Sequence, residues 1–79
     1  MTSFFPTPAL PNAVDIHVGV AIRRLREARG LSQADIASQV GVTPQQIERY
    51  ERGEERVSAS MLYELARVLD VPVSAFFET

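Results

Sequence analysis

The sequence has 79 residues, 46% of them hydrophobic, with no cysteine, one histidine and a formal net charge of −2. This length predicts one small domain, and the composition excludes a disulfide framework and a thiolate metal site. The apolar runs are too short to span a membrane, and the N-terminus lacks the basic region and apolar core of a secretion signal, so we expect a cytoplasmic protein.

The first segment, residues 1–13, is expected to be a flexible arm, and residues 14–79 to be the folded domain. Prolines at positions 6, 8 and 11 prevent this segment from forming a helix interior. Phe4, Phe5 and Leu10 make it more apolar than a typical disordered tail. The arm is therefore either a terminus without a packing role or a segment that packs against the folded domain or a partner subunit.

An amphipathic helix is predicted over residues 15–29. Val18, Ile22 and Leu25 are spaced four and three residues apart, which places them on one apolar face. Gly30 ends the pattern. We expect this face to pack against the rest of the domain.

A short helix with a defined start and end is predicted next. Ser32 can cap its start, and Asp35 lies three residues later, at the spacing of a capping box. Gly41 can adopt a positive φ at little cost, so it ends the helix. The apolar residues of this helix form one face: Ile36, Ala37 and Val40.

A second helix start follows at once. Thr43 can cap it, Pro44 suits the first helical position, and Gln46 completes a Thr-x-x-Gln capping box. Ile47 and Tyr50, three residues apart, fall on the inner face. The residues left pointing mostly outward are Gln45, Gln46, Glu48, Arg49 and Arg52.

These two helices resemble the helix-turn-helix of the phage repressor and Cro-like family, also called XRE-like. Ala37, where the helices cross, Gly41 in the turn and Ile47 six residues later match the three most constrained positions of that family. Gln33 opens the first helix, and Glu51-Arg52-Gly53 closes the second. This complete register is far more specific than an isolated Ala-x-x-x-Gly pattern.

The resemblance implies an all-α fold, a compact five-helix lambda-repressor-like DNA-binding domain with the helix-turn-helix at helices 2 and 3. It covers about residues 15–77, including a fourth helix that Ser58 or Ser60 can cap and a last short helix starting at Pro72. Asp70 lies between them, and Asp tolerates the left-handed conformation that ends a helix better than most residues.

The resemblance also implies an ion pair between the first helix and the recognition helix. In this family an Arg at the position of Arg26 commonly pairs with the Glu of the closing Glu-x-Gly motif, here Glu51. An exposed, unpaired Arg26 is the alternative. We also expect Glu48 to pair with Arg52, four residues later on the same helix.

In the implied fold the second helix of the pair lies in the major groove, and the first helix crosses the DNA backbone. The expected base contacts are Thr43, Pro44, Gln45, Gln46 and Arg49. The amide of Gln45 suits adenine, and the guanidinium of Arg49 suits guanine. Gln46 has two alternatives, folding back onto its own helix in the capping box or reaching a base.

Phosphate contacts are expected from Gln33, together with the N–H groups at the start of its helix, and from Arg52 and Arg56. The charges over residues 23–56 sum to +1 and those of the remaining residues to −3, so basic groups concentrate around this region. All eight cationic side chains are Arg. Arg suits bidentate binding of phosphate and guanine, although a high-GC genome gives the same bias.

A domain of this size reads only a few base pairs, so we expect a homodimer on an inverted repeat in double-stranded DNA. The adjacent aromatics Phe76 and Phe77 cannot both face inward on one helix. One should fill the core, and the other is a candidate dimer contact. The expected function is sequence-specific transcriptional regulation, as a repressor rather than an activator.

Two other classes of function are considered. An antitoxin or protein-interaction adaptor can use the same fold with a protein partner, which the acidic charge balance and the apolar arm favour. A controller protein of a restriction–modification system shares this size and helix count. We expect no enzyme, cofactor or metal, because the sequence has no nucleophile–base pair or phosphate-binding glycine loop, and His17 has no cysteine or second histidine as co-ligand.

Overall fold

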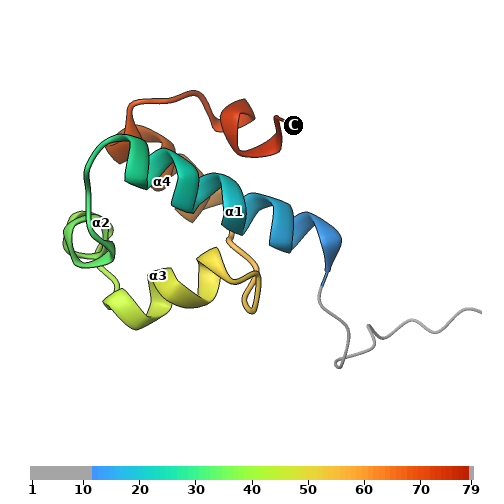
Figure 1. The fold of residues 1–79 in the computed structure, drawn as a ribbon, viewed down its shortest axis with the longest axis horizontal. Helices are drawn as coiled ribbons and strands as arrows, with labels where there is room; N and C mark the ends of the chain where they lie inside the picture. Colours follow the sequence, from blue (N-terminus) through green and yellow to red (C-terminus); the bar gives the residue numbers. More distant parts are fainter. Residues whose placement is uncertain (1–11, 79) are drawn as a thin grey trace, which may run out of the picture.

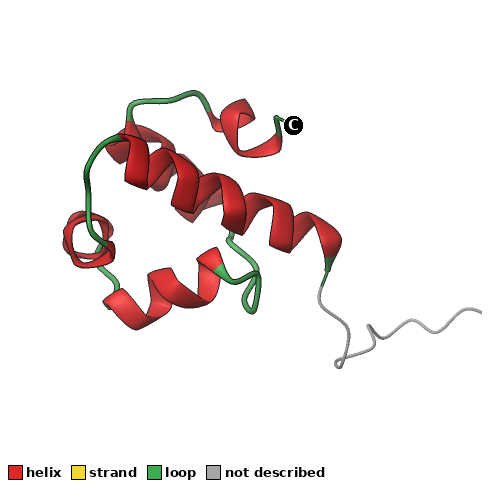
Figure 2. Cartoon of the chain, in the orientation of Figure 1, coloured by secondary structure: helices red, strands yellow, loops and turns green. Residues whose placement is uncertain are grey.

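The computed structural model describes residues 12–78, which form four α-helices and one short 3-10 helix (Figure 1). The elements are α1 (Ala13–Ala28), α2 (Gln33–Val40), α3 (Pro44–Glu51), α4 (Ala59–Leu69) and η1 (Val73–Phe77). No strand occurs in this range (Figure 2), so the all-α prediction is confirmed. The fifth element is a 3-10 helix rather than an α-helix. The expected arm, except its last two residues, lies outside the described residues.

α1 begins two residues earlier than the sequence predicted. The side-chain oxygen of Asn12 accepts hydrogen bonds from the backbone N–H of Val14, at 2.8 Å, and of Asp15, at 3.2 Å. These bonds satisfy donors that the first turn of a helix leaves free. Asn12 and Ala13, assigned by the sequence to the arm, therefore form the cap and first residue of the domain.

The helix-turn-helix has the predicted caps. Ser32 and Asp35 form a complete capping box, with the Ser32 hydroxyl accepting from the Asp35 N–H at 3.0 Å and the Ser32 N–H donating to the Asp35 carboxylate at 2.8 Å. Gly41 has a φ of 78° and ends α2. The Thr43 hydroxyl then caps α3 by accepting from the N–H of Gln46 at 3.1 Å. These local bonds fix where α2 begins and ends and where α3 begins.

The second half of the domain also follows the sequence pattern. Ser58, rather than Ser60, caps α4 by accepting from the N–H of Met61 at 3.1 Å. Asp70 ends α4 with a φ of 56°, in the left-handed region. Pro72 then precedes η1.

The core is built from all five elements. α1 crosses the middle of the molecule and packs against α3 on one side and η1 on the other, while α2 packs against α3 and α4 (Figure 1). The buried residues of the core are Val18, Ala21, Ile22, Ile36, Ala37, Ile47, Tyr50, Leu65, Ala66, Leu69 and Phe76. In the described part of the chain, no helix combines the length and apolar character needed to cross a membrane.

Two glycines allow α1 to lie directly against the C-terminal end of α3. A Cβ atom at Gly19 would lie 2.3 Å from the carbonyl oxygen of Tyr50 and 2.7 Å from that of Glu51. A Cβ atom at Gly53 would lie 2.8 Å from the Cα atom of Ile16. All three distances are shorter than real Cβ contacts, so larger residues would push the two elements apart. The backbone of α1 therefore fixes the position of α3.

Candidate nucleic-acid interface

α3 has a buried face and an exposed polar face. Ile47 and Tyr50 are buried in the core, which fixes the rotation of the helix about its axis. On the opposite side, the predicted base-contact residues Thr43, Pro44, Gln45 and Arg49 are exposed, and Gln46 is half-buried. The structure thus brings the predicted base-contact residues together at the cap and along the first turns of one short helix.

The expected ion pair between Arg26 and Glu51 is present and buried. The Nε atom of Arg26 donates to Glu51 Oε2 at 2.7 Å, and Nη2 donates to Oε1 at 3.0 Å. A third bond runs from Arg26 Nη1 to the carbonyl oxygen of Leu31 at 2.8 Å. The hydrogen bond with Glu51 raises the pKa of Arg26 although burial opposes it. This bidentate pair joins α1 to the end of α3.

Gln33 is a third member of this arrangement, which the sequence analysis missed. Its Nε2 atom donates to Glu51 Oε1 at 3.0 Å, so the first residue of α2 is joined to the same carboxylate. We call Arg26, Gln33 and Glu51 the Glu51 cluster. A polar hollow of about 200 Å³ lies over this cluster, and its other lining residues are Arg23, Glu48 and Arg52. The Glu51 cluster therefore fixes α1, α2 and α3 next to a hollow lined by three arginines.

The expected pair between Glu48 and Arg52 is present at the surface. Arg52 Nε lies 3.7 Å from Glu48 Oε1, and both side chains are more than half exposed. Exposed pairs of this kind contribute little to stability. Arg52 is therefore accessible to a ligand, as its predicted role requires.

Two other predicted contact residues have partners in the structure. Arg56 Nε lies 3.2 Å from Asp15 Oδ1, which ties Arg56 to the first turn of α1. The side-chain amide of Gln46 donates to the carboxylate of Glu55. The sequence predicted a return bond from the Gln46 side chain to the Thr43 backbone, and this prediction was wrong. The amide binds Glu55, in the loop after α3, instead. Only the half of that capping box made by the Thr43 hydroxyl is present.

The two adjacent aromatics differ in exposure. Phe76 is fully buried in the core, whereas Phe77 is 48% exposed. Successive side chains of a 3-10 helix point about a third of a turn apart, so only one of the two can face the core. Phe76 is therefore excluded as a dimer contact, and Phe77 is the member of the pair that a second copy can reach.

The comparisons with known proteins agree with this geometry. The family model described as Helix-turn-helix (HTH_3) matches residues 22–76, which is most of the chain. The chain belongs to this helix-turn-helix family. The XRE-like resemblance seen in the sequence is thereby confirmed.

Relatives of the chain are named as transcriptional regulators. An uncharacterized HTH-type transcriptional regulator of Sinorhizobium medicae (strain WSM419) is 50% identical over 68 residues, which are 86% of this chain and 49% of the relative. An uncharacterized transcriptional regulator in the ATPase CF(0) region of Rhodospirillum rubrum is 50% identical over 64 residues, 81% of this chain and 59% of the relative. The chain thus spans about half the length of the curated relatives it matches.

A solved structure shows the same fold. The restriction-modification controller protein C.AhdI from Aeromonas hydrophila superposes with a TM-score of 0.79 and 33% sequence identity. The match covers 84% of this chain and 100% of that chain. The helix-turn-helix therefore occurs with this arrangement of helices in a second member of the fold.

Proposed function

We propose that the chain is the sequence-specific DNA-binding domain of a transcriptional repressor. The outward face of α3 carries this proposal, because it is polar, exposed and held in one orientation by a buried face. In a helix-turn-helix the second helix lies in the major groove and the first crosses the DNA backbone. Membership of the helix-turn-helix family and relatives named as transcriptional regulators support the proposal.

Base reading is assigned chiefly to Gln45 and Arg49, one turn apart on the exposed face. The amide of Gln45 can both donate to and accept from adenine, and Arg49 can span guanine O6 and N7. Each such bidentate contact contributes about 1–3 kcal/mol of discrimination. Thr43 and Pro44 offer surface for a thymine methyl group or a phosphate. Gln46 would have to leave Glu55 before it reached a base.

Phosphate binding is assigned to the start of α2 and to Arg52. The side chain of Gln33 is hydrogen-bonded to Glu51. We therefore expect a phosphate to bind the free backbone N–H groups of the first turn of α2. Arg52 can exchange Glu48 for a phosphate because that pair is exposed. Arg56 is a weaker candidate, since it would first have to leave Asp15.

A helix of 8 residues reads too few base pairs for specific binding on its own, so we propose a homodimer. We assign the dimer contact to Phe77 because its aromatic side chain is exposed. Sedimentation of the full chain over a range of concentrations tests this assignment. Phe77→Ser is expected to lower the dimer population, whereas Tyr63→Ser, at a 62% exposed residue of α4, should leave it unchanged. A wild-type chain that stays monomeric at every concentration would overturn the proposed homodimer.

DNA binding is tested by selection from a random duplex pool at near-physiological salt. The expected product is an enriched inverted repeat with half-sites about one helical turn apart. Arg49→Ala should lose preference at one position of each half-site. Arg67→Ala removes the same charge from α4, outside the helix-turn-helix, and should keep the full preference. A chain that enriches no sequence contradicts the proposal.

A controller protein of a restriction–modification system is a second candidate function. The match to C.AhdI covers the whole of that chain, which favours a regulator of this kind. Genes for a restriction enzyme and a methyltransferase beside the gene for this chain would support it. If no duplex is enriched, an antitoxin or adaptor becomes the better assignment, and a co-purifying protein partner is its expected sign.

A further inference from the structure

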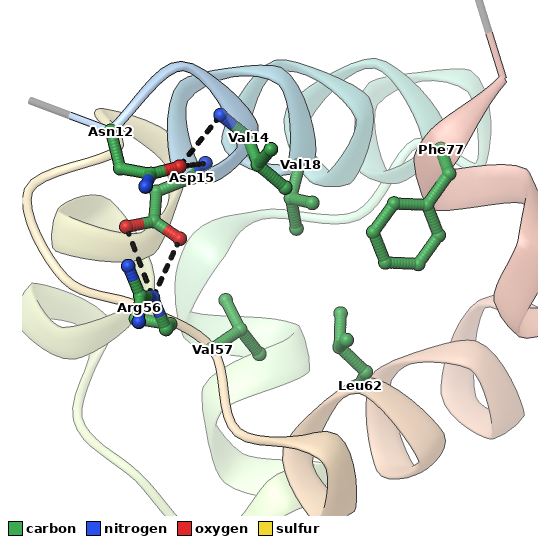
Figure 3. A pocket seen from close by; sticks show the side chains of 8 residues that line it. All are labelled: Asn12, Val14, Asp15, Val18, Arg56, Val57, Leu62 and Phe77. Carbon is green, nitrogen blue, oxygen red and sulfur yellow. Dashed lines mark hydrogen bonds and ion pairs between the residues drawn. The ribbon is translucent and has the colours of Figure 1, made fainter.

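We infer that an apolar groove beside the start of α1 is the docking site for the segment that precedes Asn12, residues 1–11 of the same chain. The groove has a volume of about 330 Å³ and lies between α1, α4, η1 and the loop that leads into α4 (Figure 3). Its apolar lining consists of Val14, Val18, Val57, Leu62 and Phe77. The groove contains none of the α3 residues assigned to DNA, and Arg56 is the one candidate phosphate contact in its lining.

The groove exposes large apolar side chains that point toward one another. Val14 is 57% exposed and Phe77 is 48% exposed, and they line the same groove as the partly buried Val57 and Leu62 (Figure 3). Neighbouring exposed apolar side chains of this kind commonly mark a binding surface. The lining therefore favours an apolar occupant.

The polar groups at the rim already satisfy one another. Asn12 accepts from the N–H groups of Val14 and Asp15, and the Asp15 carboxylate binds Arg56 at 3.2 Å. The aspartate side chain is only 16% exposed, so it has little surface left for another ligand. An uncharged occupant would leave these bonds intact, whereas a charged one would compete with Asp15 for Arg56, whose side chain is 71% exposed.

Residues 1–11 have the composition of such an occupant. They contain no charged side chain, and they carry the aromatic pair Phe4 and Phe5 together with Leu10. Three prolines prevent the segment from burying these residues in a helix of its own. Proline also restricts the backbone before docking, which lowers the entropy lost on binding.

The connection of the segment to the domain places it at the groove. Asn12 lines the groove, and Leu10 and Phe5 precede it by two and seven residues. An extended chain covers about 3.3 Å per residue, so the side chains on either side of the prolines can reach the groove. The covalent link also gives the segment a high effective concentration there. Once docked, the arm would form part of the surface that a second copy meets at Phe77.

Paramagnetic broadening in the full chain tests this docking. The natural sequence has no cysteine, so Ser3→Cys provides a single site for a nitroxide label. We expect the label to broaden the methyl signals of Val57 and Leu62, while Ile36 of α2, which does not line the groove, keeps a sharp signal. Adding Phe4→Ser and Phe5→Ser to the labelled chain should restore the signals of the groove.

A mixed sample identifies which chain supplies the arm. Isotope-labelled chains without nitroxide are mixed with nitroxide-labelled chains that carry no isotope label. With the nitroxide-labelled chains in excess, docking within one chain predicts weaker broadening of Leu62 in this mixture than in the chain that carries both labels, because a label docked on the partner lies farther away. Broadening as strong as in that chain would mean that the arm of a second copy occupies the groove and would overturn the assignment. Equal broadening of Ile36 and Leu62, or an unchanged pattern after the Phe4 and Phe5 substitutions, would also overturn it.

Discussion

Glu51 and Glu48 lie one turn apart on α3, but their ion pairs differ in kind. Glu51 binds Arg26 of another helix at 2.7 Å, and the two side chains are 4% and 10% exposed. Glu48 lies 3.7 Å from Arg52, the residue that caps the C-terminal end of the same helix, and those side chains are 52% and 64% exposed. A buried Arg–Glu pair therefore fixes the inner side of α3, whereas the exposed Arg–Glu pair leaves the side chains on its outer side free to change partners.

The buried pair positions α3, whereas the exposed pair can take part in DNA recognition. A buried pair need not add net stability, because removing two charges from water opposes folding, but breaking it leaves one charge buried and unpaired. Glu51 also accepts from Gln33, so three helices depend on one carboxylate. The exposed pair can exchange a carboxylate for a phosphate at little loss of folding stability.

Glu51→Ala is expected to destabilise the fold by about 3–5 kcal/mol, because it leaves the Arg26 guanidinium buried without its carboxylate. Glu48→Ala removes the same group from the exposed pair and should change stability by less than about 1 kcal/mol. Urea unfolding of both variants measures the difference. Equal losses would break the distinction between the two pairs.

Gly19→Ala tests whether the backbone contact also fixes α3. The added Cβ would meet the carbonyl oxygens of Tyr50 and Glu51, and we expect a net loss of about 1–3 kcal/mol despite the better helix propensity of Ala. Val20→Ala, at the exposed neighbouring position, should stay within about 0.5 kcal/mol of wild type in the same urea unfolding. A stabilised Gly19→Ala chain would show that α1 and α3 can separate freely.

Replacing both partners of the buried pair distinguishes its effect on stability from its effect on DNA binding. Arg26→Met combined with Glu51→Leu leaves no unpaired buried charge, so stability should return close to that of wild type. Gln33 nevertheless loses its acceptor, and affinity for the enriched duplex is expected to stay below the wild-type value. Unfolding and DNA titration of the same sample check both results. Full recovery of affinity would mean that Gln33 needs no fixed position.

Asp35 is an exposed carboxylate that, unlike Glu48, is held by the backbone. Hydrogen bonds from the Ser32 N–H and hydroxyl lower the pKa of Asp35. Its contribution to stability is therefore present above the unfolded-state pKa, about 3.9, and is lost as pH falls through the lower folded-state value. Thermal unfolding between pH 5 and pH 2 should show a smaller acid loss for Asp35→Asn than for wild type. Identical acid losses would contradict this assignment.

The sequence predicted elements whose signals are local. Capping residues such as Ser32, Thr43 and Ser58 lie within a few residues of the N–H groups they accept from, so their roles could be read along the chain. The pair between Arg26 and Glu51 was predicted from family resemblance rather than from spacing. Its partners are too far apart in sequence for any periodic pattern to connect them.

The contacts that the sequence missed depend on folding. In the sequence, Gly19 is only a residue of low helix propensity. Its role is visible once the fold places the carbonyl oxygens at the end of α3 against it. Likewise, Gln33, Gln46 and Arg56 have long side chains, and their partners come from other segments of the folded chain. Residue type predicted that these side chains could bind DNA, but the fold decides which of them are already engaged.

Backbone NMR of the full chain, titrated with the enriched duplex, tests most directly whether the exposed face of α3 reads DNA. We predict that the largest amide shifts occur at Gln45 and Arg49 and in the first turn of α2 after Ser32. Residues of the apolar groove such as Leu62 should shift little. Shifts concentrated at the groove, with α3 unchanged, would contradict the assignment of α3 as the DNA-reading helix.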